Sequence, residues 1–149
     1  MANVITLGVV DFAAEREFYT RLHWPLVLDL EDFAVFELRG ILLALFPVEQ
    51  LAADARVKPG SRRDGIRFSI IINIDTPSGV DEMIGLFREA GGSVSKEPTD
   101  AEFFDGRSAY ASDPEGNYWE IAWAAPDNSV LVAARRAAGL RSDSSVQSP

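Results

Sequence analysis

Glu120 is the residue of this sequence whose surroundings most clearly indicate chemistry. It follows a stretch, residues 113–117, that reads Asp-Pro-Glu-Gly-Asn. Proline fixes φ there, and glycine and asparagine tolerate a left-handed backbone, so a tight turn is predicted. A strand follows, and its side chains alternate between two faces. Glu120 shares one face with Tyr118 and Ala122, whereas the other face is apolar and holds Trp119, Ile121 and Trp123.

A second strand, predicted over residues 66–74, offers polar partners for Glu120. If Phe68, Ile70, Ile72 and Ile74 pack against a helix, the side chains that face a cavity with Glu120 are Arg67, Ser69, Ile71 and Asn73. Arg67 can pair with Glu120 and satisfy both charges without a ligand. It can equally bind a carboxylate or phosphate of a substrate. Glu120 is then either a structural ion-pair partner or a hydrogen-bonding anchor or general base for a ligand.

Further side chains can complete a ligand pocket. Thr6 faces away from the expected core on a first strand predicted over residues 4–10. Aromatic residues suit a planar or apolar ligand, although core packing or a dimer contact is the alternative for Phe103 and Phe104. The candidate ligand-binding residues are Arg67, Ser69, Asn73, Thr6, Tyr110, Tyr118 and Phe104.

Composition restricts the function. The chain has 149 residues, 47% of them hydrophobic, which is typical of one globular domain with a real core. Its formal net charge of −9 disfavours nucleic acid and anionic membranes as partners. The absence of cysteine excludes disulfides and thiolate sites. We find no stretch long enough to cross a membrane and no signal-peptide pattern at the start, so we expect a cytoplasmic protein.

The elements that position these residues read as two copies of β-α-β-β-β. In the first half, the strand over residues 4–10 leads into a helix from Asp11 to about Leu22. In the second half, Thr76 caps a helix with an apolar stripe that ends at Gly91. The other strands are predicted at residues 26–30, 34–38, 41–47, 66–74, 93–96, 107–112 and 118–123.

The domain organisation follows from this repeat. We predict one domain over residues 1–126, with a first module at 1–58 and a second at 64–126, joined by a polar connector with one possible helical turn. A single module cannot bury its apolar sheet face alone, so the modules pack together or exchange with a second chain. Residues 127–149 are predicted to form a C-terminal helix and a polar, flexible tail.

The string D-P-E-G-N-Y-W-E-I-A-W, together with Asp11 and the Phe18-Tyr19 pair in the first helix, resembles the vicinal-oxygen-chelate superfamily. That superfamily includes glyoxalase I, extradiol dioxygenases and bleomycin-resistance proteins. The resemblance implies an α+β fold in which two βαβββ modules form a cupped mixed sheet around a cavity, with helices on the outer face. It also implies a homodimer, and it places Glu120 at the position of the last metal ligand.

The other implied ligand positions do not hold metal-binding residues. Alignment on Asp11 puts the ligand of the first strand at Val4, and alignment on Asp75 puts that of the second module at Ser69. Glu120 alone survives of the usual set, and the single histidine, His23, lies elsewhere and suits a surface position. One carboxylate cannot fix a catalytic metal, so we predict that the protein has no metal or other cofactor.

Three functional hypotheses follow. The first is a metal-free protein that binds a small organic molecule in the cavity, with Glu120 as anchor. The second is an enzyme, a lactoylglutathione-lyase-like lyase, an isomerase or a dioxygenase, which uses Glu120 as base or gathers metal through Glu37, Glu49 or Asn73. The third is a structural or regulatory module whose aromatic side chains fill the cavity.

Overall fold

The computed structural model describes residues 3–60, 66 and 68–140. Its elements occur in the predicted order, each half containing a strand, a helix and three strands. The first half contains β1 (Val4–Val9), α1 (Phe12–Arg21), β2 (Leu26–Asp29), β3 (Ala34–Leu38), β4 (Ile41–Pro47) and α2 (Val48–Asp54). The second half contains β5 (Ile70–Asn73), α3 (Pro77–Ala90), β6 (Ser93–Asp100), β7 (Gly106–Ser112), β8 (Tyr118–Ala124) and α4 (Ser129–Ala137).

The strands form two four-stranded mixed sheets with the same topology. The N-terminal sheet has the order β1-β4-β3-β2 and the C-terminal sheet has the order β5-β8-β7-β6. In each sheet the strand before the helix pairs in parallel with the last strand of its module, and the remaining pairs are antiparallel. The predicted α+β fold of two βαβββ modules is therefore confirmed.

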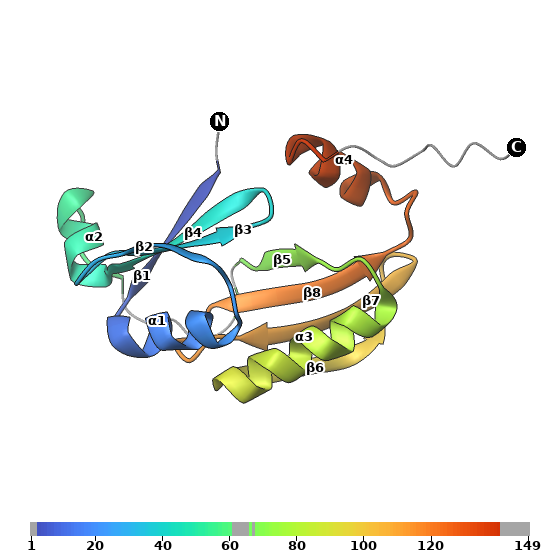
Figure 1. Ribbon diagram of the computed structural model, residues 1–149, viewed down its shortest axis with the longest axis horizontal. Coiled ribbons are helices and arrows are strands. Elements are labelled where there is room, and N and C mark those ends of the chain that lie inside the picture. The colour runs from blue at the N-terminus through green and yellow to red at the C-terminus, as the bar shows by residue number, and fades with distance from the viewer. Residues whose placement is uncertain (1–2, 61–65, 67, 141–149) are drawn as a thin grey trace, which may run out of the picture.

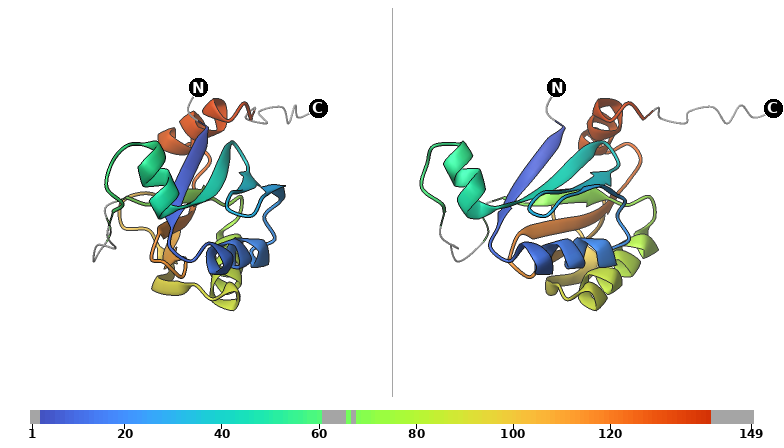
Figure 2. Two further views of the ribbon diagram at one scale, coloured as in Figure 1. Left: turned by 90° about the vertical axis from the view of Figure 1, so that its left-hand side faces the viewer. Right: turned by 60° about the vertical axis from the view of Figure 1, so that its left-hand side comes forward.

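The two long helices pack next to each other and share one core with both sheets. α1 contacts α3 and β4, while α3 covers β6, β7 and β8, and the two helices lie on the same side of the molecule in Figure 1 and Figure 2. α3 begins at the predicted cap, where Thr76 Oγ1 accepts from the Gly79 amide, and ends at Gly91 with φ of 105°. Within the described residues no helix is both long and apolar enough for a membrane crossing.

Asp113 connects the turn before β8 to α1. Its side chain is 1% exposed, and it accepts hydrogen bonds from the Asn117 backbone amide and side-chain amide, both at 2.7 Å. The Tyr19 hydroxyl donates to Asp113 Oδ2 at 2.7 Å and accepts from Trp119 Nε1 at 3.2 Å. The carboxylate thus fixes the turn and holds α1 against the first residues of β8.

The strand expected at residues 66–74 is shorter than predicted. β5 begins at Ile70, which lies opposite Trp119, and β8 begins only one residue earlier, so the preceding residues have no strand to pair with. The prediction that Phe68 belongs to the helix-packed core is wrong, because its side chain is 57% exposed. Arg67, the last part of the connector from residue 61 and the tail after residue 140 lie outside the described residues, whereas the helical turn predicted in the connector is present as α2.

Glu15 is a buried carboxyl group on α1. It is 0% exposed, and neither of its oxygens has a partner in hydrogen-bonding geometry among the described residues. Burial, and next the negative charge of Asp113, raise the pKa of Glu15 from 4.5 to about 9. The side chain is therefore a neutral acid at pH 7, which is the form that costs least to bury.

This buried acid predicts a falling stability with rising pH. The unfolded chain loses the Glu15 proton near pH 4.5 and the folded chain near pH 9, so the folded state binds more protons between these values. The free energy of unfolding should then decrease across this range, by at most about 1.4 kcal/mol per pH unit. Glu15→Gln should remove this decrease.

Urea unfolding of both proteins at pH 5, 6.5 and 8 measures the effect. The stability difference should grow in favour of the glutamine variant as the pH rises. Glu17→Gln is the matched control, because Glu17 lies on the same helix but is exposed and pairs with Arg21. A constant difference between Glu15→Gln and the parent protein across the three pH values contradicts the assignment.

Candidate functional site

Polar side chains gather on the face of the C-terminal sheet that points away from α3, which we call the open face. Cross-strand pairing places them: Glu120 lies opposite Ile71 on β5 and opposite Tyr110 on β7, while Asn73 lies opposite Ala122. Trp119 and Ile121 occupy the other face and are fully buried. The prediction from alternation along β8, that Glu120 faces away from the tryptophan core, is thus confirmed.

Tyr110 and Glu120 form the central contact of the open face. The Tyr110 hydroxyl donates to Glu120 Oε2 at 2.8 Å. Burial, and then this hydrogen bond to a carboxylate, raise the pKa of Tyr110 to about 12. The phenol is therefore a fixed donor at neutral pH, and it holds Glu120 in one orientation.

Lys96 and Ser108 extend this polar row, and the sequence did not single them out. Lys96 Nζ donates to Ser108 Oγ at 2.9 Å and lies 5.8 Å from the centre of the Tyr110 ring, a distance at which an ammonium is attracted by an aromatic face. The open face thus offers a carboxylate, a phenol and an ammonium to one ligand. Lys96 reaches this row because it lies opposite Tyr110 in the sheet. The sequence does not reveal this pairing, because the register between β6 and β7 shifts on both sides of Lys96.

A cavity of about 550 Å³ lies between the two sheets and meets the open face at β5. Ile71 and Asn73 belong to both. The other walls are mainly apolar and come from the α1–β2 loop, the β3–β4 hairpin, β5, β8 and α4. They include Trp24, Leu38, Ile41, Ile70, Ile72, Trp119 and Leu131. This volume and lining match those of pockets that bind small organic molecules.

The C-terminal helix closes one side of the cavity. Asn128 caps α4 by accepting from the amides of Val130 and Leu131, and Leu131 is buried. Arg135 Nη2 on α4 lies 3.6 Å from Asp75 Oδ1, in the short segment between β5 and α3. Gly40 lies so near α4 that an added Cβ would be 2.9 Å from that of Ala138. The helix beyond Pro126 therefore contributes walls to the cavity.

The structure brings together some predicted site residues and separates others. Tyr110, Tyr118, Glu120 and Asn73 share the open face, and Ser69 immediately precedes β5 on a half-buried position. Thr6 belongs to the N-terminal sheet, where it pairs with Ala44. Phe104 lines a different pocket, near Trp123. The suggested pairing of Arg67 with Glu120 falls outside the described residues.

The residues present do not fit a resident metal. Glu120 has Tyr110 as its hydrogen-bonding neighbour, and the implied ligand positions carry Val4 and Ser69. The described part of the chain contains no group of three or more histidine, cysteine, aspartate or glutamate side chains placed to hold a metal ion. Glu37 and Asn73, which we considered as unusual ligands, both line the cavity.

The fold and the open face define a two-module βαβββ protein with a polar site on its second sheet. Comparison with known proteins gives the same class. The sequence matches the Glyoxalase/Bleomycin resistance protein/Dioxygenase superfamily over residues 2–121. The chain therefore belongs to this superfamily, as the resemblance in the sequence implied. No curated protein matches the chain.

Solved structures show the same fold. A glyoxalase-related enzyme from Fulvimarina pelagi is 27% identical with a TM-score of 0.75, over 83% of this chain and 87% of that chain. A glyoxalase/bleomycin resistance protein/dioxygenase from Nocardioides is 25% identical with a TM-score of 0.70, and the match covers 83% of this chain and 82% of that chain. A lactoylglutathione lyase from Agrobacterium tumefaciens is 24% identical with a TM-score of 0.64, over 83% and 92%.

The contact between Tyr110 and Glu120 predicts how the phenol titrates. Glu120→Gln should lower the pKa of Tyr110 from about 12, because the negative charge is lost, while burial keeps it above 10. Fluorine NMR of protein labelled with 3-fluorotyrosine measures the change, since this phenol ionises at a milder pH. The midpoint should fall in Glu120→Gln and stay unchanged in Glu102→Gln, which alters an exposed carboxylate. Equal midpoints in all three proteins contradict the contact.

Proposed function

We propose that this protein binds a small organic molecule without a metal, with the polar end of the ligand on the open face and its apolar body in the cavity between the sheets. The observation that carries this proposal is a row of side chains across the open face, in which Glu120, Tyr110 and Lys96 follow one another on neighbouring strands from Ile71 at the cavity wall. Ile71 joins the two parts, since it lies opposite Glu120 and also lines the cavity.

The chemistry of the open face indicates the kind of ligand. Glu120 accepts hydrogen bonds, so it suits a hydroxyl or amine of the ligand. Lys96 is a donor and a cation, which suits a neighbouring carbonyl or carboxylate oxygen. The apolar cavity walls suit an aromatic or aliphatic body. A 2-hydroxy acid with an aromatic side chain combines these features, and mandelate is the simplest probe.

Saturation-transfer NMR on chelator-treated protein tests the proposal. Mandelate should bind, and phenylacetate, which lacks the hydroxyl, should bind more weakly. Glu120→Gln should weaken mandelate by about 10-fold, since a hydrogen bond to a charged group contributes about 1.5–3 kcal/mol. Glu102→Gln is the control and should bind as the parent does. Equal affinities for mandelate and phenylacetate, or equal affinities of Glu120→Gln and the parent, contradict the proposed site.

An enzyme that uses Glu120 as a base is the alternative from the same geometry. Tyr110 fixes one oxygen of Glu120, which leaves the carboxylate positioned for proton transfer. Incubation of mandelate in deuterated water distinguishes the two. If the parent protein exchanges the hydrogen on the hydroxyl-bearing carbon of mandelate for deuterium and Glu120→Gln does not, the protein is a base-dependent enzyme. Binding without exchange supports a binding protein. The cytoplasm remains the predicted location.

We further propose that a second copy of the chain covers the open face. Ile71 on the open face is 50% exposed, and Phe68, two residues before β5, is 57% exposed. Large apolar side chains that are exposed near one another often mark an interaction surface. β5 also lies at an edge of its sheet, which leaves backbone groups available for a partner. A homodimer would shield both features from water.

Sedimentation velocity measures this association. The parent protein should sediment as a dimer, and Phe68→Glu should shift it toward monomer by placing a charge in the contact. Phe103→Glu is the matched control, because Phe103 is 93% exposed at the far hairpin and should leave the dimer intact. A monomeric parent protein, or equal dissociation by both variants, contradicts the proposal.

A further inference from the structure

A second pocket lies at the other end of the C-terminal sheet, away from the open face. It is formed by the N-terminus of α3, the β6–β7 hairpin and the end of β8, and its volume is about 550 Å³. Trp123 faces it from the side of β8 that also carries Trp119 and Ile121, opposite to Glu120. The pocket is therefore distinct from the proposed ligand site.

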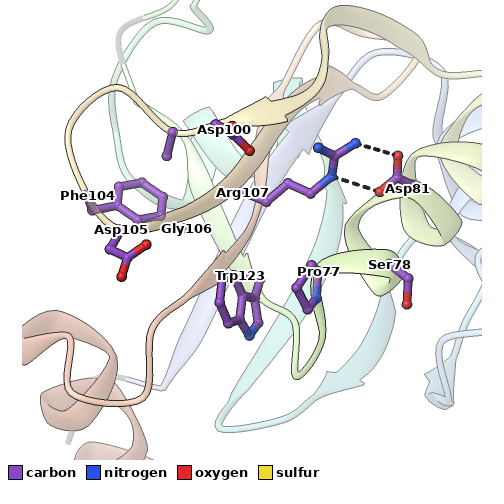
Figure 3. Close-up of a pocket in the computed structure, with 10 residues that line it drawn as sticks. Pro77, Ser78, Asp81, Asp100, Phe104, Asp105, Gly106, Arg107 and Trp123 are labelled. Atoms are coloured by element: carbon purple, nitrogen blue, oxygen red, sulfur yellow. Dashed lines mark hydrogen bonds and ion pairs between the residues drawn. The ribbon is translucent and has the colours of Figure 1, made fainter.

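The side chains that line this pocket carry more negative than positive charge. Arg107 reaches from β7 to α3 and donates two hydrogen bonds of 2.8 Å to the carboxylate of Asp81, as Figure 3 shows. Arg107 is the one cationic side chain among the lining residues, and Asp81 binds its guanidinium group through both hydrogen bonds. Asp100 and Asp105 also line the pocket and are exposed. The lining thus carries three carboxylates and one paired guanidinium, an excess of negative charge.

Aromatic and ring side chains form the rest of the pocket. Phe104, Trp123 and Pro77 line it, and Figure 3 shows them around the space beside Arg107. Gly106 lets the Phe104 ring fold onto the backbone, since an added Cβ would lie 2.5 Å from that ring and 2.2 Å from the Trp123 carbonyl oxygen. The hairpin is fixed by hydrogen bonds from the Ala101 amide to Gly106 and from the Ala125 amide to Asp105. Backbone hydrogen bonds therefore hold the part of the hairpin that forms this wall of the pocket.

We propose that this pocket binds an organic ammonium ion that carries a flat apolar body. The aromatic faces of Phe104 and Trp123 attract a cation and also pack against a ring. Asp100 and Asp105 supply negative charge for the ammonium, and the bond between Asp81 and Arg107 prevents the arginine from repelling it. An anion of the same shape meets this excess of carboxylates and is rejected.

Three indole probes of one shape and different charge test this inference. Tryptamine is a cation, indole-3-acetamide is neutral and indole-3-acetate is an anion at pH 7. Titrations followed by amide NMR of the full chain should show shifts at the β6–β7 hairpin with tryptamine, weaker ones with the amide and none with the acetate. Salt at about 0.5 M, which makes the electrostatic screening length roughly twofold shorter than in physiological buffer, should weaken the binding of tryptamine.

Variants separate the two contributions. Asp100→Asn with Asp105→Asn should weaken tryptamine at least about 5-fold and leave the neutral amide unchanged, because only charge is removed. Phe104→Ala should weaken both probes, whereas Phe103→Ala, the exposed neighbour outside the pocket, should weaken neither. Asp54→Asn with Glu49→Gln, two exposed residues of α2 outside the pocket, removes the same number of charges and controls for net charge. The inference is overturned if indole-3-acetate binds as well as tryptamine, or if the double asparagine variant binds tryptamine as the parent does.

Discussion

The buried carboxylate of Asp113 is the constraint on which the site depends. It closes the turn before β8 through Asn117 and receives the Tyr19 hydroxyl from α1. Tyr19 in turn accepts from the indole of Trp119. Because Trp119 is thereby fixed toward the helices, alternation puts Glu120 on the opposite face. A contact between residues about a hundred positions apart thus decides which way the Glu120 carboxylate points.

The same junction explains why Glu15 is a neutral acid. α1 must lie close to the turn for Tyr19 to reach Asp113, and this brings Glu15 into the region where that carboxylate is already buried. Two charged carboxylates there would repel each other in a poorly solvated space. Glu115 also binds the amides of Val10 and Asp11 just before α1, each at 2.7 Å. Acidic groups therefore join the two modules. Their mutual repulsion is smaller because Glu15 is protonated.

Local patterns in the sequence predicted the order of elements and the orientation of Glu120, because caps, turns and alternation depend on neighbouring residues. The start of β5 was not predicted, since it depends on where its partner β8 begins. Lys96 was missed because bulges shift the register of β6. The burial of Glu15 had a signal, since it precedes Phe18 by three residues and Tyr19 by four and so lies on their helix face. Acidic side chains on helices are usually solvated, which concealed it.

The scaffold of the superfamily is thus retained, while the positions that the resemblance assigns to metal ligands hold Val4 and Ser69 in addition to Glu120. We propose that the open face binds a small organic molecule through Glu120 without metal. Amide NMR of chelator-treated, isotope-labelled protein with a library of small hydroxy acids and amines tests this most directly. We expect shifts concentrated at Ile71, Tyr110 and Glu120 before any metal is added. Shifts that arise there only after nickel, zinc or manganese is supplied would contradict it.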